Sequence, residues 1–102
     1  MRRVQLSQTF IAQFDNLLEQ GYPQFGERVV LEKRERVFRL IEDHLAHYPR
    51  MPRSADHGLC VYPVRGTPFV LIYDFDDAEL RIYGIFHGRA DLGPFDPGSV
   101  DW

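Results

Sequence analysis

The sequence predicts one α+β domain in which a hairpin of two helices packs on one face of a small antiparallel sheet. Apolar residues recur at helical spacing through the first half of the chain, and short apolar segments separated by turns fill the second half. The 102 residues can form a single core, and a hydrophobic content of 44% favours folding over disorder. The predicted order of elements is therefore β-α-α-β-β-β.

The first predicted strand covers residues 3–6 and ends at Ser7, which is a favourable N-cap for a helix. The helix that follows carries an apolar stripe with spacings of three and four residues. The stripe consists of Phe10, Ile11, Phe14, Leu17 and Leu18. We expect this helix to end at Gly21, because glycine readily adopts the left-handed turn that follows a helix.

A second, longer helix is predicted to start near Pro23, since proline is tolerated in the first turn of a helix. Its apolar stripe consists of Val30, Val37, Phe38, Ile41, Leu45 and Tyr48. The charged residues between these positions are expected to form a solvated face, on which Glu32 and Arg36 have the spacing of an ion pair. Pro49 and Pro52 are expected to end the helix.

Three strands are predicted in the second half, over residues 59–62, 69–74 and 80–87. The turns between them are short enough for hairpins, so the strands should form an antiparallel meander. The helices cover one face of this sheet, and we expect the other face to be open. Residues 1–92 should form the domain, and residues 93–102 an irregular tail that is either mobile or pinned by Phe95 and Trp102.

Composition limits the classes of function. The formal net charge of −3 lacks the basic balance that is typical of nucleic-acid binders, and Lys33 is the only lysine. Cys60 has no partner for a disulfide within the chain and is interpreted as a buried, inert thiol. No export signal or membrane-spanning segment is evident, so we expect a cytoplasmic protein. The spacing of His44 and His47 completes no ligand signature, and we expect neither a metal nor a cofactor.

The last predicted strand carries the residues that could perform chemistry. Strict alternation divides it into a core-like face with Leu80, Ile82, Gly84 and Phe86 and a second face with Arg81, Tyr83, Ile85 and His87. Guanidinium groups stabilise phosphate charge, imidazole moves protons near neutral pH, and a phenol ring stacks on bases. Spacing alone favours an ordinary solvated sheet face, on which Arg81 pairs with a neighbouring carboxylate and His87 is only hydrogen-bonded.

Several segments together resemble a known family. They are the opening Val4-Gln5-Leu6-Ser7, the segment Tyr48-Pro49-Arg50 after the helices, residues 69–77 (FVLIYDFDD) and residues 80–91 (LRIYGIFHGRAD). Over about residues 3 to 92 the chain resembles the RelE/ParE superfamily of bacterial type II toxins, and is closer to the ParE-like branch. The resemblance implies a cognate antitoxin that forms a hetero-oligomer with the toxin.

The superfamily contains two activities. ParE-like members inhibit DNA gyrase by binding, whereas RelE-like members cleave messenger RNA in the ribosome with a cluster of lysines and arginines. That cluster is missing here, so we favour gyrase and expect Arg81, Tyr83, His87 and Arg89 to bind the target. The alternatives are a ribonuclease that uses His87 with Arg81 or Arg65, and an inactive relative that only binds its antitoxin. Because the chain is acidic, the antitoxin contact should depend more on apolar anchoring than on charge.

Overall fold

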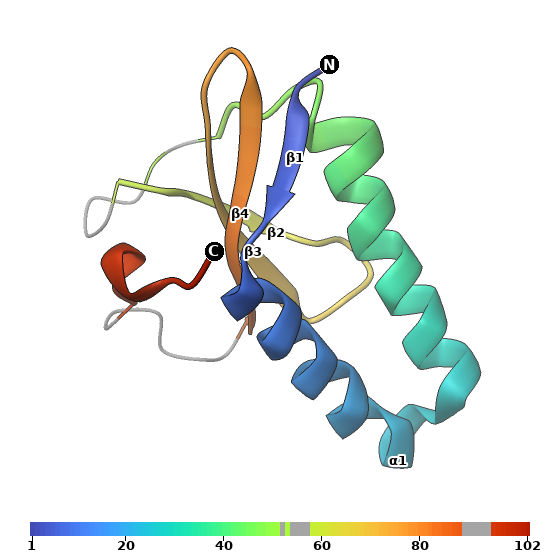
Figure 1. The fold of residues 1–102 in the computed structure, drawn as a ribbon. Coiled ribbons are helices and arrows are strands. Elements are labelled where there is room, and N and C mark those ends of the chain that lie inside the picture. Colours follow the sequence, from blue (N-terminus) through green and yellow to red (C-terminus); the bar gives the residue numbers. More distant parts are fainter. Residues whose placement is uncertain (52, 54–57, 89–94) are drawn as a thin grey trace.

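The computed structural model describes the chain except for residues 52, 54–57 and 89–94. Its sheet has four strands, β1 (Arg3–Leu6), β2 (Cys60–Pro63), β3 (Phe69–Phe75) and β4 (Glu79–His87), in the order β1-β4-β3-β2. The helical hairpin lies on one face of the sheet, which confirms the predicted fold class (Figure 1). The sheet is mixed, because β1 pairs parallel with β4 while the other two pairs are antiparallel.

Helix α1 (Gln8–Arg39) contains both arms of the hairpin. Ser7 caps it as predicted, since its Oγ accepts a hydrogen bond of 2.8 Å from the backbone N–H of Phe10. The predicted end at Gly21 is wrong, because the helix continues through Gly21 and Pro23 and breaks at Gly26. Gly26 has φ 80° and ψ 165°, a conformation that is essentially restricted to glycine.

Gly21 has a different role from the one predicted for it. A Cβ built on Gly21 would lie 3.1 Å from Cγ2 of Val30 in the opposite arm. The missing side chain therefore lets the two arms, residues 8–25 and 27–39, approach each other closely near the turn. The second arm continues into a π-helical turn, η1 (Leu40–Leu45), and ends before Pro49.

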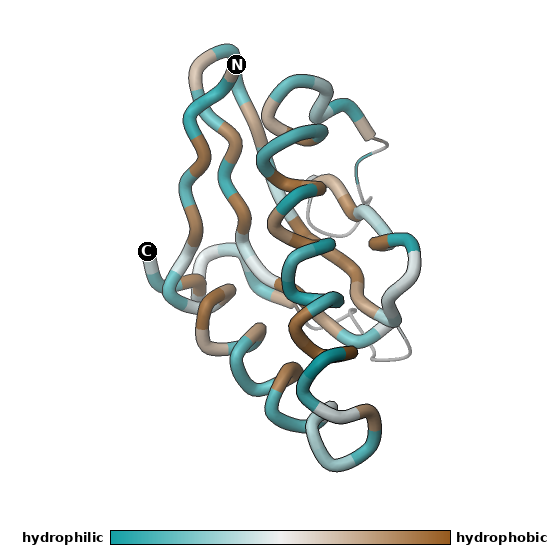
Figure 2. Tube along the Cα trace, turned by 90° about the vertical axis from the view of Figure 1, so that its right-hand side faces the viewer, coloured by the Kyte–Doolittle hydropathy of each residue, from teal (hydrophilic) through white to brown (hydrophobic). Residues whose placement is uncertain are grey.

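The main core lies between the hairpin and the sheet. The predicted stripes account for most of its helical side, with Phe10, Phe14, Val37, Ile41 and Leu45 at most 3% exposed. Tyr48 is an exception, because it lies beyond the helical turns and is 72% exposed. Figure 2 shows hydrophobic and hydrophilic segments alternating along both arms and along the strands, as expected for elements with one buried face.

A β-bulge in β4 changes which side chains share a face. Ile72 of β3 pairs with Gly84, but the next residue, Tyr73, pairs with Ile82, so Tyr83 is an extra residue on β4. Beyond the bulge the alternation is reversed, and Ile85 enters the main core instead of facing outward. Strict period-two reasoning could not find this reversal, because a bulge adds one residue without a break in the apolar pattern.

The second face of the sheet is not open, contrary to expectation. Residues 95–102, here called the C-terminal strap, lie on the side of the sheet opposite to the hairpin and contain a 3-10 turn, η2 (Pro97–Ser99) (Figure 1). The Phe95 ring lies 5.5 Å from the Phe86 ring, and the Trp102 ring lies 4.9 Å from the Tyr83 ring. The tail is thus pinned through the two aromatic residues named in the sequence analysis.

Candidate functional site

Arg81 lies on β4 opposite Asp74 of β3, on the sheet face that points away from the hairpin. Its guanidinium contacts carboxylates of Asp76 at 2.9 Å, Asp74 at 3.6 Å and Glu79 at 3.6 Å. These residues surround the β3–β4 turn, where the Asp76 side chain also accepts hydrogen bonds from the backbone N–H groups of Ala78 and Glu79. The turn sequence therefore brings three carboxylates to one guanidinium.

These contacts favour the ionised carboxylates. The hydrogen bond from Arg81, together with the amides of Glu79 and Ala78, lowers the pKa of Asp76 to about 2. Burial of Asp74 raises its pKa, but the hydrogen bonds from Arg53 and from the Phe75 amide, with the charges of both arginines, hold it below its usual value. Arg81 is correspondingly stabilised as a cation, and its pKa is raised.

Arg53 and Arg3 complete what we call the turn cluster. Arg53 donates to Asp74 at 2.8 Å and to the carbonyl of Gly58 at 3.0 Å, and Arg3 contacts Glu79 at 3.3 Å. The cluster consists of Arg3, Arg53, Arg81, Asp74, Asp76 and Glu79. The turn cluster joins β1 and Arg53 to the turn between β3 and β4. Because its three positive and three negative charges balance, it does not form a cationic surface.

His87 does not share a face with Arg81, which corrects the predicted working face. His87 pairs with Phe69, whose side chain belongs to the main core, whereas Arg81 pairs with Asp74 on the other face. The two residues are also six positions apart on β4, which corresponds to roughly 15–20 Å along a strand. The bulge at Tyr83 is the physical reason, because its extra residue reverses the faces on which the side chains of residues 84–87 lie.

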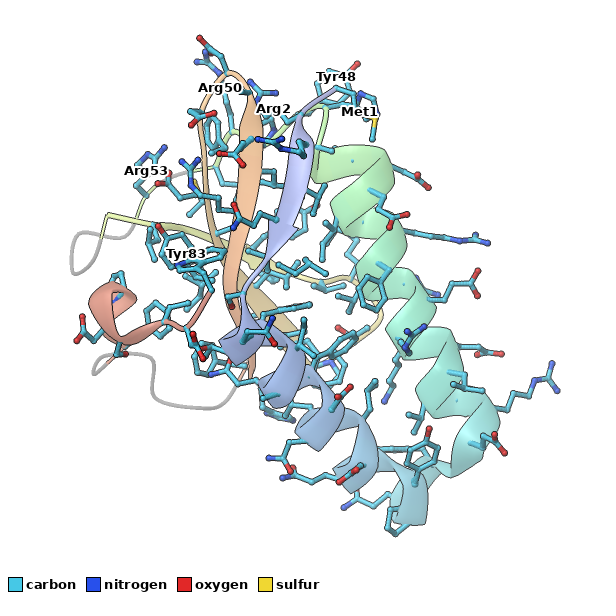
Figure 3. All side chains as sticks on the ribbon, in the orientation of Figure 1. Met1, Arg2, Tyr48, Arg50, Arg53 and Tyr83 are labelled. Atoms are coloured by element: carbon cyan, nitrogen blue, oxygen red, sulfur yellow. The ribbon has the colours of Figure 1, made fainter. Side chains whose placement is uncertain are left out.

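The other predicted site residues do not all join Arg81. Arg65 is exposed in the turn between β2 and β3, at the opposite end of β3 from Asp74 and at the same end as Phe69, which pairs with His87. Tyr83 lies on the face away from the hairpin, beside the C-terminal strap (Figure 3). Arg89 lies outside the described residues. The structure therefore brings Tyr83 and Arg81 to one side of the sheet and places His87 elsewhere.

An apolar pocket that sequence reasoning missed lies between the tip of the hairpin and the start of β3. Its volume is about 330 Å³, and its lining includes Leu17, Val30, Phe69 and His87. Near it, Phe25 and Val29 are 51% and 37% exposed, an arrangement that leaves apolar side chains in contact with solvent. Phe25 is an apolar residue that lies outside both predicted stripes. Its position is a sign in the sequence of an exposed apolar surface at the hairpin tip.

One cation lines the pocket. The ammonium of Lys33 lies 4.1 Å above the centre of the Phe25 ring. Within the described part of the chain, Lys33 forms no ion pair. This end of the molecule thus combines an apolar hollow with the positive charge of Lys33.

Neither a metal site nor a membrane span is found among the described residues. Their histidine, cysteine, aspartate and glutamate side chains form no group of three or more that could hold a metal ion. Cys60 is buried, and its burial raises the pKa of the thiol, as expected for an inert core residue. Helix α1 is long, but in the regions described no helix has an apolar stretch sufficient to cross a membrane.

The fold is one found in toxin–antitoxin systems. A solved structure described as a chromosomal ParDE TA system from P. aeruginosa superimposes with a TM-score of 0.74, covering 85% of this chain and 96% of that chain. The two are 16% identical, so this likeness concerns the fold alone. A comparison with curated proteins finds no match.

The family follows from the sequence match. Residues 4–92 match the family described as the ParE toxin of the type II toxin-antitoxin system parDE. The chain belongs to this family and is a ParE-type toxin, which confirms the resemblance drawn from residues 3 to 92.

Proposed function

We propose that this toxin inhibits DNA gyrase by binding and that a cognate antitoxin neutralises it. The observation that supports binding over RNA cleavage by His87 with Arg81 is the separation of these two residues across the sheet. A ribonuclease needs a proton-transfer group within hydrogen-bond reach of its substrate and a cation directed at the same phosphate. Here the guanidinium is held by three carboxylates, and the imidazole lines an apolar pocket on the other side.

The proposed target surface is the sheet face that carries Tyr83. Tyr83 is partly exposed there, with the turn cluster farther along the same strand. Aromatic and arginine side chains frequently dominate the binding energy of protein interfaces. We keep Arg81 and Arg89 as proposed contributors, whereas His87 faces the pocket and belongs to a different surface.

The proposed antitoxin surface is the pocket at the hairpin tip. Its apolar lining fits an anchoring side chain of an amphipathic segment, and Lys33 fits a carboxylate beside that anchor. This arrangement supports apolar anchoring with local charge complementarity, even though the whole toxin is acidic.

A supercoiling assay with purified gyrase and relaxed plasmid tests the proposal. We expect the toxin to suppress supercoiling and Tyr83→Ala to weaken suppression at least tenfold. Tyr48→Ala, the same change at an exposed tyrosine away from this face, should leave suppression unaltered. Gyrase that remains fully active in a large excess of toxin would contradict the proposal.

A parallel assay separates the alternatives. Messenger RNA in translating ribosomes should stay intact when the toxin is added. Transcripts that are cut by the toxin but not by His87→Ala would establish a ribonuclease instead. Overexpression without growth arrest and without any effect on gyrase would identify an inactive relative that only binds an antitoxin.

A further inference from the structure

The C-terminal strap is fastened at two places on the sheet face opposite to the hairpin. Two edge-to-face ring contacts hold it, between Phe95 and Phe86 and between Trp102 and Tyr83. At its end the Asp101 carbonyl accepts hydrogen bonds from the backbone N–H groups of Gln8 at 2.7 Å and Thr9 at 3.3 Å. The Asp101 N–H donates in return to Oγ1 of Thr9 at 3.0 Å.

The strap covers an aromatic surface. Tyr83 and Phe86 both lie on β4, and Gly84 between them pairs with Ile72. Ile72 points away from the hairpin, because its neighbours Leu71 and Tyr73 belong to the main core, and yet it is fully buried. With the strap removed, this sheet face would present the two aromatic rings that the strap contacts.

The strap is weakly held compared with the rest of the fold. None of its described residues belongs to the main core, and Trp102 remains 40% exposed. A few ring contacts and hydrogen bonds must offset the entropy of ordering eight residues. Opening also leaves the start of α1 capped, because Ser7 Oγ still accepts from Phe10. The domain can therefore lose the strap without losing its fold.

We propose that the strap is a displaceable cover, and that the toxin engages its target through the surface of Tyr83 and Phe86 after the strap has moved away. This rests on the proposed function, since it specifies how the target surface becomes available. Covering this surface hides aromatic side chains that would otherwise promote unspecific association. Only molecules with an open strap can bind the target. The apparent association constant is therefore the intrinsic constant multiplied by the fraction of open molecules.

Locking the strap tests the proposal. The hydrogen bonds between Thr9 and Asp101 bring these residues within the range of a disulfide, so Thr9→Cys with Asp101→Cys can be joined by oxidation. We expect the oxidised protein to bind gyrase at least tenfold more weakly than the same protein after reduction, which is the matched control. Equal binding by the oxidised and reduced forms would overturn the proposal.

Loosening the strap provides the opposite test. Phe95→Ala should increase growth arrest at equal expression, whichever target the toxin has. A decrease in growth arrest would show that the strap belongs to the binding surface, and this would overturn the proposal. Trp102 is the single tryptophan, so its quenching by acrylamide reports strap opening directly. Quenching should rise in Phe95→Ala and fall in the oxidised cross-linked protein, with the thermal unfolding of the core unchanged in Phe95→Ala.

These readouts separate the two proposals. Gyrase that is unaffected by the wild-type toxin contradicts the proposed function, while the growth and quenching measurements still decide on the strap. Quenching of Trp102 that does not change between the oxidised and reduced forms contradicts a strap that opens.

Discussion

Arg81 shows how one side chain can resemble a functional group in the sequence and have a structural role in the folded protein. Its position on the predicted outer face of the strand favours phosphate recognition, but the guanidinium donates a hydrogen bond to Asp76 and forms ion pairs with Asp74 and Glu79. Asp74 and Asp76 were visible in the sequence as a turn, and no pattern showed that both would meet Arg81. That meeting depends on the β3–β4 register, which places Arg81 opposite Asp74.

The pH dependence of stability tests the role of Arg81. The pKa of Asp76 is about 2 in the folded protein and that of Asp74 is also lowered, both below the usual value of 3.8. The ionised carboxylates therefore stabilise the fold above about pH 4, and this contribution is lost as the pH falls toward 2. Arg81→Gln should cost roughly 1 kcal/mol at pH 7.

Urea unfolding between pH 2 and pH 7 provides the measurement. The stability of the wild type should fall more steeply below pH 4 than that of Arg81→Gln, because the variant has already lost part of the carboxylate stabilisation. Parallel pH profiles for the two proteins would mean that the turn cluster does not stabilise the ionised carboxylates.

At the scale of elements, periodicity predicted most of the structure. Ser7 as N-cap, the buried stripe positions Phe10, Phe14 and Leu18, and the three later strands were found where the spacing of residues placed them. Ile11 of the same stripe is 40% exposed. The errors arose at Gly21 and at Tyr83. Glycine can end a helix or permit close packing, and the sequence does not distinguish the two. A bulge depends on the partner strand, which the local pattern does not contain.

The hairpin turn gives a test at this scale. Gly26→Ala should destabilise the protein by about 1–3 kcal/mol, because φ 80° with ψ 165° is strongly unfavourable for alanine. Gly21→Ala is the matched control, since a helical conformation suits alanine and the crowding against Val30 offsets a gain of about 1 kcal/mol in helix propensity. Denaturant unfolding should show a large loss for Gly26→Ala and a change within about 1 kcal/mol for Gly21→Ala. Equal losses would contradict the assigned turn.

At the scale of the whole molecule, the described surfaces divide into two regions. The hairpin end combines the apolar pocket with Lys33, and the opposite sheet face carries Tyr83 beneath the C-terminal strap. The acidic composition favours an antitoxin contact that depends on apolar anchoring, which stays a prediction. It could not predict the pocket, which forms between residues such as Leu17 and Phe69 that are distant in sequence.

The hairpin end gives a test of the proposed antitoxin surface. Phe25→Ala should weaken antitoxin binding at least tenfold, because it removes an exposed aromatic ring beside the pocket. Tyr48→Ala, at the other end of the molecule, serves as the control and should bind normally (Figure 3). Isothermal titration with purified antitoxin gives both affinities. A loss for Tyr48→Ala with none for Phe25→Ala would place the contact elsewhere.

The separation of Arg81 from His87 is tested most directly by a double-mutant cycle on growth arrest, with Arg81→Gln, His87→Ala and the double variant expressed at equal levels. Groups on opposite faces of the sheet act independently, so the free-energy effects of the two single changes should add in the double variant. If Arg81→Gln alone and His87→Ala alone each reduce growth arrest as much as both together, the two side chains work as one catalytic unit, and the account of a toxin that acts by binding is contradicted.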